Sequence, residues 1–366
     1  MNIIIFVIIL LVLVVVHEAG HFFLAKSFGI RVDEFGFGFP PKIFGKKFGE
    51  TEYTLNLLPL GGFVRIFGES PDDESISGPD ASRSFVNKPK WKQAIVLFAG
   101  IFANFLLAWL LFSIGFMSGL PTSVGSEPAG SKLSDVNLVV LSVVPKSPAE
   151  IAGLKSGDKV VSILSGQNMT TYISPETVQS FVTGSEGKVI DIGYTRGKDP
   201  LINMAKIIPV KNTTDGKLQI GISMDMIGNL KLPFFSAIGE GAVMDWSSAK
   251  STVVGLYTLI AQTVRGKGSL SSVTGPVGMV GIVGDAYKFG FVYLLSFAAL
   301  ISVNLAIINL VPFPALDGGR LFFLLIEKIK GSHINPKVAN TVNTIGFCIL
   351  ILLMIVITYH DVIKLF

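Results

Sequence analysis

"VVVHEAGHFFLA", residues 14–25, places two histidines and a glutamate inside an otherwise unbroken apolar run. The run extends over residues 3–25, and a membrane span needs about 20 predominantly apolar residues. Ionisable side chains at membrane depth are costly, so within a span they mark a functional site. His17, Glu18 and His21 therefore predict chemistry inside the first span.

The composition indicates a membrane protein. Of the 366 residues, 50% are hydrophobic and 15% are charged, which is too apolar for an ordinary soluble enzyme of this length. The net charge of +4 gives no indication of nucleic-acid binding, and none is expected. We expect a polytopic α-helical membrane protein with four main transmembrane helices, over residues 1–25, 94–118, 289–319 and 338–360.

The charges that flank these spans predict the topology. The first positive charge, Lys26, follows the first span, which is the wrong polarity for a cleaved signal peptide. Lysines and arginines also gather before the second span and between the third and fourth, and such loops are cytoplasmic by the positive-inside rule. Both termini and the region between the second and third spans are then extracytoplasmic. The one cysteine, Cys348, lies in the last span and does not identify the compartment.

Residues 17–21 form an H-E-x-x-H motif. A helix places residues i and i+4 on one face, so His17 and His21 can hold one zinc ion while Glu18 deprotonates a water. Chance occurrence is the alternative for so short a motif, but three unneeded polar residues would be costly in a span. The motif predicts one Zn2+ per chain and Glu18 as the catalytic base.

A catalytic zinc takes three protein ligands and leaves one position open. Asp317, in "NLVPFPALDGGRL" (309–321), ends the long uncharged run of the third span. The first and third spans run in the same direction. The 14 apolar residues before His17 make about 21 Å of helix, so His17 and Asp317 are expected at a similar depth. Asp317 is the predicted third ligand.

Other candidates for the third ligand are less suitable. Glu327 is a rival, but it lies further into the polar loop beside Lys328, where a solvated ion pair is the expected role. His333 lies in that cytoplasmic loop and His360 at the outer end of the last span.

The residues before Asp317 predict an interrupted helix. Pro312 and Pro314 each remove a backbone donor and clash with the preceding turn. Irregular backbone at membrane depth is tolerated only where it is buried in protein or lines a water-filled cavity. Asn304 is expected to make a helix–helix hydrogen bond, whereas Asn309 could hold a substrate backbone or a developing oxyanion.

H-E-x-x-H in the first span, combined with N-x-x-P-x-P-x-L-D-G in a later one, resembles the site-2 protease family of intramembrane zinc metalloproteases. Segments 34–44, 56–66, 85–108 and 275–279 resemble further parts of that family. The resemblance implies that His17, His21 and Asp317 are the zinc ligands. It implies that Glu18 is the catalytic base. The substrate-binding residues that it implies are Asn309, Pro312, Gly61 and Gly62.

The same resemblance implies an endopeptidase that cleaves transmembrane segments within the lipid bilayer of a bacterial inner membrane. Its expected substrates are single-pass membrane proteins such as an anti-sigma factor, and remnant signal peptides. A metal transporter would not require the general base, and an inactive PDZ scaffold would not require the full ligand set. The hydrolase is therefore favoured over both.

Region 26–93 is predicted to be a cytoplasmic, membrane-associated β-loop. "TEYTLNLL" (51–58) and "GGFVRIFG" (61–68) favour a hairpin with its turn at 59–62. A hairpin edge can pair with an extended substrate segment as an added strand. The alternative is a plain cytoplasmic loop with two short strands.

The external region predicts a PDZ-like α/β domain over 127–226. Residues 138–163 indicate a strand, a short helix, a glycine turn and a second strand, and 218–224 resemble the strand that borders a PDZ peptide groove. The alternative is a small β-domain that only spaces the membrane parts. Better-known relatives in this subgroup carry two PDZ domains in tandem, whereas this chain has room for one. Region 227–288 follows, with an amphipathic helix at 247–266 expected on the outer membrane surface.

Overall fold

The computed structural model divides into two compact units. Unit 1 comprises Met1–Ser113, Ile238–Gly284 and Ser296–Phe366, and unit 2 comprises Ile114–Ala237 and Asp285–Leu295. The described residues are 1–70, 72–166, 168–197, 199–211, 216–266, 274–332 and 334–363.

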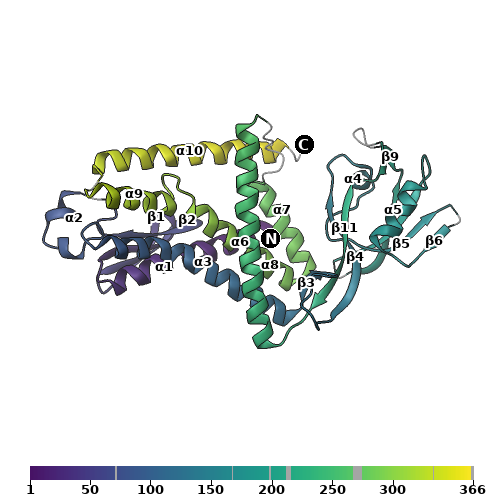
Figure 1. Ribbon diagram of the computed structural model, residues 1–366, viewed down its shortest axis with the longest axis horizontal. Helices are drawn as coiled ribbons and strands as arrows, with labels where there is room; N and C mark the ends of the chain where they lie inside the picture. Colours follow the sequence, from purple (N-terminus) through teal and green to yellow (C-terminus); the bar gives the residue numbers. More distant parts are fainter. Residues whose placement is uncertain are drawn as a thin grey trace. The chain divides into compact units, whose positions relative to one another are not determined.

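Unit 1 consists of long apolar helices and a small β-sheet (Figure 1). Four of the described helices are long and apolar enough to cross a membrane, as predicted. In the last of these helices, Pro336–Ile363, only 6% of the most apolar stretch is buried within the protein, so its surface suits lipid rather than water. These helices are α1 (Asn2–Ser27), α3 (Lys90–Ser118), α8 (Phe291–Leu310) and α10 (Pro336–Ile363).

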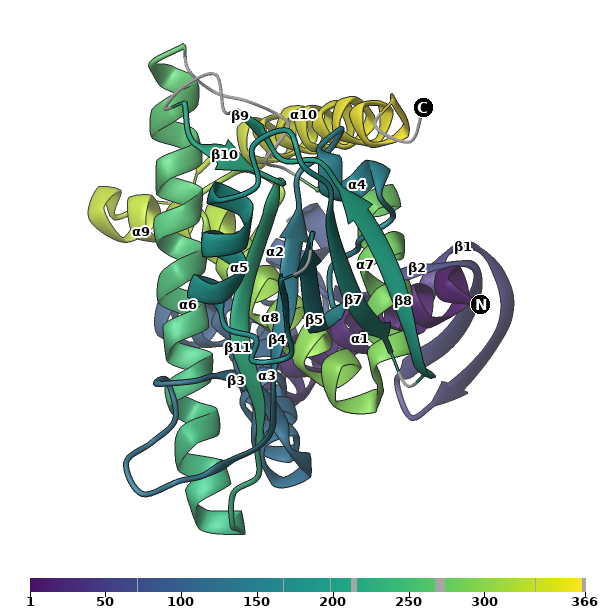
Figure 2. The same cartoon turned by 90° about the vertical axis from the view of Figure 1, so that its right-hand side faces the viewer.

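The longest described helix, α6 (Phe234–Val264), begins well before the predicted 247–266. It runs across the direction of α10 in both ribbon views (Figures 1 and 2). Thr252 on α6 donates a 2.7 Å hydrogen bond to the side-chain oxygen of Asn304 on α8, which is the helix–helix contact expected for Asn304. The remaining helices of this part are α2 (Asp73–Ser77), the 3-10 helix η1 (Ala81–Arg83), α7 (Pro276–Phe289) and α9 (Asp317–Lys330).

The β-region differs from the predicted hairpin. One strand, β2 (Thr51–Ile66), runs through the expected turn at 59–62, and the actual turn joins it to β1 (Val32–Phe48). Gly49 in that turn has φ +62°, a left-handed conformation that glycine adopts at little cost. Residues 34–37 pair with 62–65 on one side and with 52–55 on the other. This double pairing keeps the proline- and glycine-containing segment extended.

The third span also differs from its predicted bounds. Helix α8 ends at Leu310 rather than at 319, and Asp317 is the first residue of α9. The prolines at 312 and 314 explain the break, because neither can continue a regular helix. The predicted interruption is therefore present, and it places Asp317 at a helix start instead of a helix end.

Unit 2 is an open sheet with the order β3-β11-β4-β5-β7-β8, and β6 pairs with β5. The short α4 and the longer α5 accompany it, an arrangement typical of a PDZ domain (Figure 2). The predicted domain end at 226 falls inside β11, which continues to Leu230 because it pairs there with β3. The elements are β3 (Leu120–Ser123), β4 (Leu133–Val143), α4 (Pro148–Ile151), β5 (Lys159–Ser165), β6 (Asn168–Thr170), α5 (Pro175–Thr183), β7 (Ile190–Arg196), β8 (Asp199–Ile207), β9 (Val210–Lys211), β10 (Leu218–Gln219) and β11 (Ile222–Leu230).

Candidate metal centre

Helix α1 presents both histidines on its protein-facing side. They belong to a stripe of buried residues spaced four apart, which is the period of one helix face. His17 and His21 are each 7% exposed, and their Nε2 atoms lie 3.2 Å apart. The stripe consists of Leu13, His17, His21 and Ala25.

Asp317 reaches the same point from α9. Its Oδ2 lies 3.0 Å from Nε2 of His17 and 3.3 Å from Nε2 of His21. Zinc bonds of about 2.0–2.1 Å at tetrahedral angles put ligand atoms about 3.3 Å apart. The three atoms therefore have the identities and the separations that one zinc ion requires.

The hydrogen bond of His21 fixes which of its nitrogens can bind a metal. Nδ1 lies 2.8 Å from the backbone oxygen of Val96 on α3. A carbonyl only accepts, so Nδ1 carries the proton and Nε2 keeps its lone pair. That lone pair points at the other two candidate ligand atoms, and such a convergence is stabilised by a cation.

Two glycines let α1 and α3 approach closely enough for this contact. A Cβ on Gly20 would lie 2.4 Å from the backbone oxygen of Ala99, and a Cβ on Gly100 would lie 2.2 Å from Nε2 of His21. Real Cβ atoms do not come so close. Any side chain at Gly100 would thus occupy the space that the His21 ring needs.

Asn104 on α3 is the neighbour of His17. Its Nδ2 lies 3.3 Å from Nδ1 of His17, and the side chain is fully buried. Its backbone oxygen accepts a 2.8 Å hydrogen bond from Ser302 on α8. Helix α3 therefore contacts both histidines on the nitrogen that faces away from Asp317.

Glu18 lies beside the last part of β2. Its carboxyl interacts with the backbone N–H of Val64, and a Cβ placed on Gly62 would be 3.9 Å from its Cγ. Among the described strands, residues 62–65 pair on one side only, with residues 34–37. A carboxylate next to the histidines therefore faces a strand edge.

The segment that carries Asp317 is held by α10. Ala315 has φ +73°, an unusual conformation for a residue with a Cβ, and its N–H donates a 3.3 Å hydrogen bond to Asn343 on α10. Arg320, one turn after Asp317, pairs with Glu69, which follows β2. The start of α9 is thus fixed to α10 and to the sheet.

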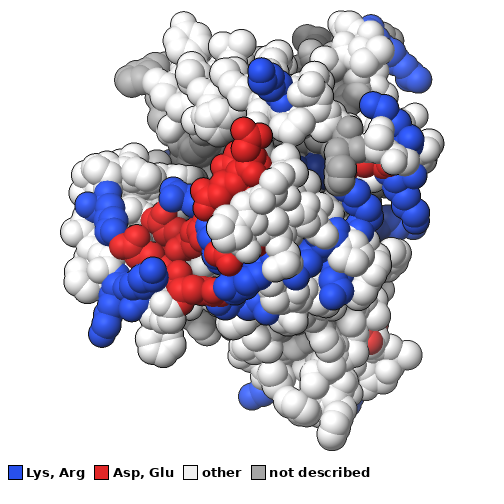
Figure 3. Space-filling view, turned by 90° about the vertical axis from the view of Figure 1, so that its left-hand side faces the viewer, with Lys and Arg blue, Asp and Glu red and all other residues white. Residues whose placement is uncertain are grey.

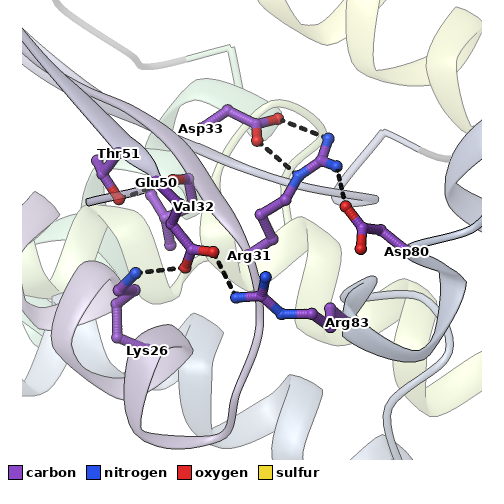
Figure 4. A network of polar contacts seen from close by, with 8 residues as sticks. All are labelled: Lys26, Arg31, Val32, Asp33, Glu50, Thr51, Asp80 and Arg83. Atoms are coloured by element: carbon purple, nitrogen blue, oxygen red, sulfur yellow. Dashed lines mark hydrogen bonds and ion pairs between the residues drawn. The ribbon is translucent and has the colours of Figure 1, made fainter. Parts of the chain in front are cut away.

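An ionic network holds the sheet against the end of α1 (Figure 4). Glu50, in the β1–β2 turn, pairs with Lys26 and with Arg83, the latter at 2.6 Å. Arg31 pairs with Asp33 and Asp80 at 2.8 and 2.7 Å. Figure 3 shows that charged side chains gather on this end of unit 1. The network fixes the sheet whose far edge lies beside Glu18.

The rejected ligand candidates lie elsewhere. Glu327 pairs with Lys90 and accepts a 2.9 Å hydrogen bond from the N–H of Ile334. Its partner differs from the expected Lys328. His360 lies in the last turns of α10, and His333 lies outside the described residues.

The predicted substrate-binding residues occupy two places. Gly61 and Gly62 lie in β2 near α1, where the nearest atoms to their Cβ positions include Val14, Val15 and Glu18. Asn309 is half-buried in the last turn of α8, and Pro312 is exposed in the turn that follows. Their contact with substrate stays a prediction.

Sequence reasoning did not single out Asn104 or Gly100. Asn104 offered a signal, because it is a polar residue inside an uncharged span. Gly100 offered none, since its role depends on a ring contributed by another helix.

Comparison with known proteins identifies the family. A model of peptidase family M50 matches residues 5–353, and the chain belongs to that family. The regulator of sigma-W protease RasP of Bacillus subtilis is 31% identical over 441 residues, covering 100% of this chain and 99% of that protein. The zinc metalloprotease RasP of Geobacillus kaustophilus is 30% identical over 443 residues, with 100% and 98% covered. A protein of Clostridium perfringens is 38% identical over 352 residues, with 96% and 95% covered.

These matches confirm the prediction of a zinc metalloprotease of the site-2 protease type in a membrane. The solved PDZ domain of the SdrC-like protein from Listeria monocytogenes is also similar, at 23% identity and a TM-score of 0.21. It covers 25% of this chain and 92% of that chain.

Proposed function

We propose that this zinc metalloprotease hydrolyses peptide bonds within the membrane-spanning segments of other membrane proteins. We assign His17, His21 and Asp317 as the zinc ligands and Glu18 as the base. The observation that carries the proposal is that these side chains converge around an apolar helix long enough to cross a bilayer. A peptide bond must therefore come to membrane depth to meet them.

The chemistry follows from the side chains. When bound, zinc supplies a Lewis acid that polarises the scissile carbonyl and makes the attacking water more acidic. Glu18 takes the proton from that water and passes it to the leaving amine. His21 keeps its metal-facing nitrogen unprotonated, because Val96 holds the proton on the other.

The strand edge beside Glu18 supports a route for the substrate. A helical peptide bond is shielded by its own hydrogen bonds, and pairing with residues 62–65 would draw it into an extended form. Gly61 and Gly62, beside Val14, Val15 and Glu18, are proposed to contact that segment. Asn309 and Pro312 are proposed to contact it from the irregular turn before Asp317.

The substrate class is a single-pass membrane protein such as an anti-sigma factor, together with remnant signal peptides. The name of the Bacillus subtilis relative, regulator of sigma-W protease, supports the first. We place the enzyme in a bacterial inner membrane with the PDZ domain and both termini outside the cytoplasm. A groove of about 480 Å³ between α5 and the β10–β11 segment supports peptide recognition by that domain.

The base is tested with Glu18→Gln, which keeps the size of the side chain but cannot accept a proton. In proteoliposomes with a model transmembrane substrate, cleavage should fall by about 10²–10⁴-fold while bound zinc stays at the wild-type level. Glu327→Gln is the matched control, because that glutamate pairs with Lys90 and should leave the cleavage rate nearly unchanged. Cleavage by Glu18→Gln at the wild-type rate would refute this mechanism.

A further inference from the structure

We propose that Asn104 is a positioning residue that accepts a hydrogen bond from Nδ1–H of His17 and so holds Nε2 ready for the metal. The inference rests on the proposed ligand role of His17. It assigns to α3, which supplies none of the three ligands, the task of orienting both histidines.

The first observation is an unpaired buried atom. The side chain of Asn104 is fully buried, and its carbonyl Oδ1 has no hydrogen-bond partner among the described residues. The amide nitrogen of the same side chain lies 3.3 Å from Nδ1 of His17. Buried amide oxygens are nearly always paired, so the amide orientation needs an explanation.

The second observation is the direction in which the His17 ring points. Its Nε2 lies 3.0 Å from Oδ2 of Asp317 and 3.2 Å from Nε2 of His21. A metal-binding nitrogen is unprotonated, and a neutral imidazole then carries its proton on the other nitrogen. Nδ1 of His17 must therefore donate, and it faces an amide nitrogen that also donates.

A half-turn of the Asn104 amide pairs Oδ1 with Nδ1–H of His17 and so removes the conflict between two donors. The oxygen and nitrogen of an amide occupy nearly equivalent positions. After the turn, Oδ1 would lie within hydrogen-bond distance of Nδ1–H. Without the turn, Nδ2 can pair with Nδ1 only if the proton of His17 lies on Nε2, which is the nitrogen that a metal needs unprotonated. Only the turned arrangement leaves Nε2 of His17 free for a metal.

His21 is oriented in the same way, by a hydrogen bond from its Nδ1 to an acceptor on α3. His21 Nδ1 donates to the backbone oxygen of Val96, which lies on α3 eight residues before Asn104. Asn104 is itself held in place, because Ser302 on α8 donates to its backbone oxygen at 2.8 Å. Helix α3 thus presents one acceptor to each histidine from a fixed position.

The test compares two substitutions at one position. Asn104→Asp keeps an acceptor of the same shape but no longer carries a donor, whereas Asn104→Leu removes both. We measure zinc affinity by chelator competition and the absorption spectrum of the cobalt-substituted protein. Loss of an orienting partner typically costs about 10–100-fold in metal affinity. We expect that loss for Asn104→Leu, a loss of no more than a few-fold for Asn104→Asp, and a changed cobalt spectrum for the leucine variant alone.

Asn304→Leu is the matched control, since it removes a half-buried asparagine that bonds to Thr252. It should lower thermal stability without changing zinc affinity. If the leucine variant at 104 does not insert, Asn104→Ala removes the same acceptor without adding apolar volume.

Wild-type zinc affinity in Asn104→Leu or Asn104→Ala would overturn the inference, and so would Asn104→Asp binding as weakly as the leucine variant. His17→Ala separates this failure from failure of the proposed function. If His17→Ala keeps its zinc, the ligand assignment itself is wrong. If it loses zinc while the variants at 104 do not, only the role of Asn104 is wrong.

Discussion

Asp317 is the residue on which the proposed metal site should depend most, because it brings the only negative charge among the three proposed ligands. Asp317→Ala removes that charge and one of three bonds, so we expect the purified protein to lose most of its zinc, measured by elemental analysis. Glu327→Ala is the control and should keep about one zinc per chain. If Asp317→Ala kept its full zinc content, the third ligand would have to be another residue.

Gly100 tests the close packing of α3 against His21. Gly100→Ala would place a methyl group 2.2 Å from Nε2 in the present arrangement, so the ring must move away from the ligand position. We expect reduced zinc affinity with the protein still folded. Gly255→Ala is the control, since a Cβ at that helical position meets nothing within 4 Å. Unchanged affinity in Gly100→Ala would mean that the ring has another acceptable position.

At the scale of elements, the β1–β2 sheet is fixed by charges that titrate. The hydrogen bond from Lys26, followed by the one from Arg83, lowers the pKa of Glu50 below its ordinary value of 4.5. A carboxyl group whose pKa is lower in the folded protein than in the unfolded chain stabilises the fold at pH values above its unfolded-state pKa. This stabilisation is lost as the pH falls toward its folded-state pKa.

Glu50→Gln should therefore be less stable than wild type at pH 7, by up to about 1 kcal/mol, and the difference should shrink below about pH 4.5. Thermal unfolding in detergent at several pH values measures it. Glu186→Gln removes an exposed pair with Lys211 and should have little effect at any pH. A difference for Glu50→Gln that grows on acidification would contradict the assigned pairing.

The spans and the H-E-x-x-H motif were predictable because apolar length and the cost of buried charge are local properties of the sequence. The β-region was predicted only in part. Pro59, Gly61 and Gly62 carry turn signals, but β2 continues through them, with Leu58 paired to Phe39 and Gly62 to Phe37. The roles of Asn104 and Gly100 depend on contacts with residues about 80 positions away. The polar character of Asn104 within a span was visible in the sequence, but its partner was not, and Gly100 gave no local signal.

At the scale of the whole molecule, the PDZ domain can be removed at a natural junction. Leu120 and Leu230 are antiparallel partners, so their Cα atoms lie about 5 Å apart and a short glycine-serine linker can replace the residues between them. If the domain restricts access, the deletion should keep zinc and cleave the model substrate at a near wild-type rate while cutting more proteins in cells. Proteomics of membrane-protein fragments measures this. A variant that keeps zinc but cuts nothing would show that the domain delivers substrates instead.

The separation of the proposed ligands along the chain has a consequence for biosynthesis. His21 emerges early, but Asp317 follows 296 residues later (317 − 21), and at about 5–20 residues per second the ribosome needs roughly 15–60 s to reach it. During that interval the first span can enter the bilayer with its histidines but without the carboxylate that completes the set. Under the proposed function, the nascent enzyme cannot cleave the membrane proteins being inserted around it until the start of α9 has been made.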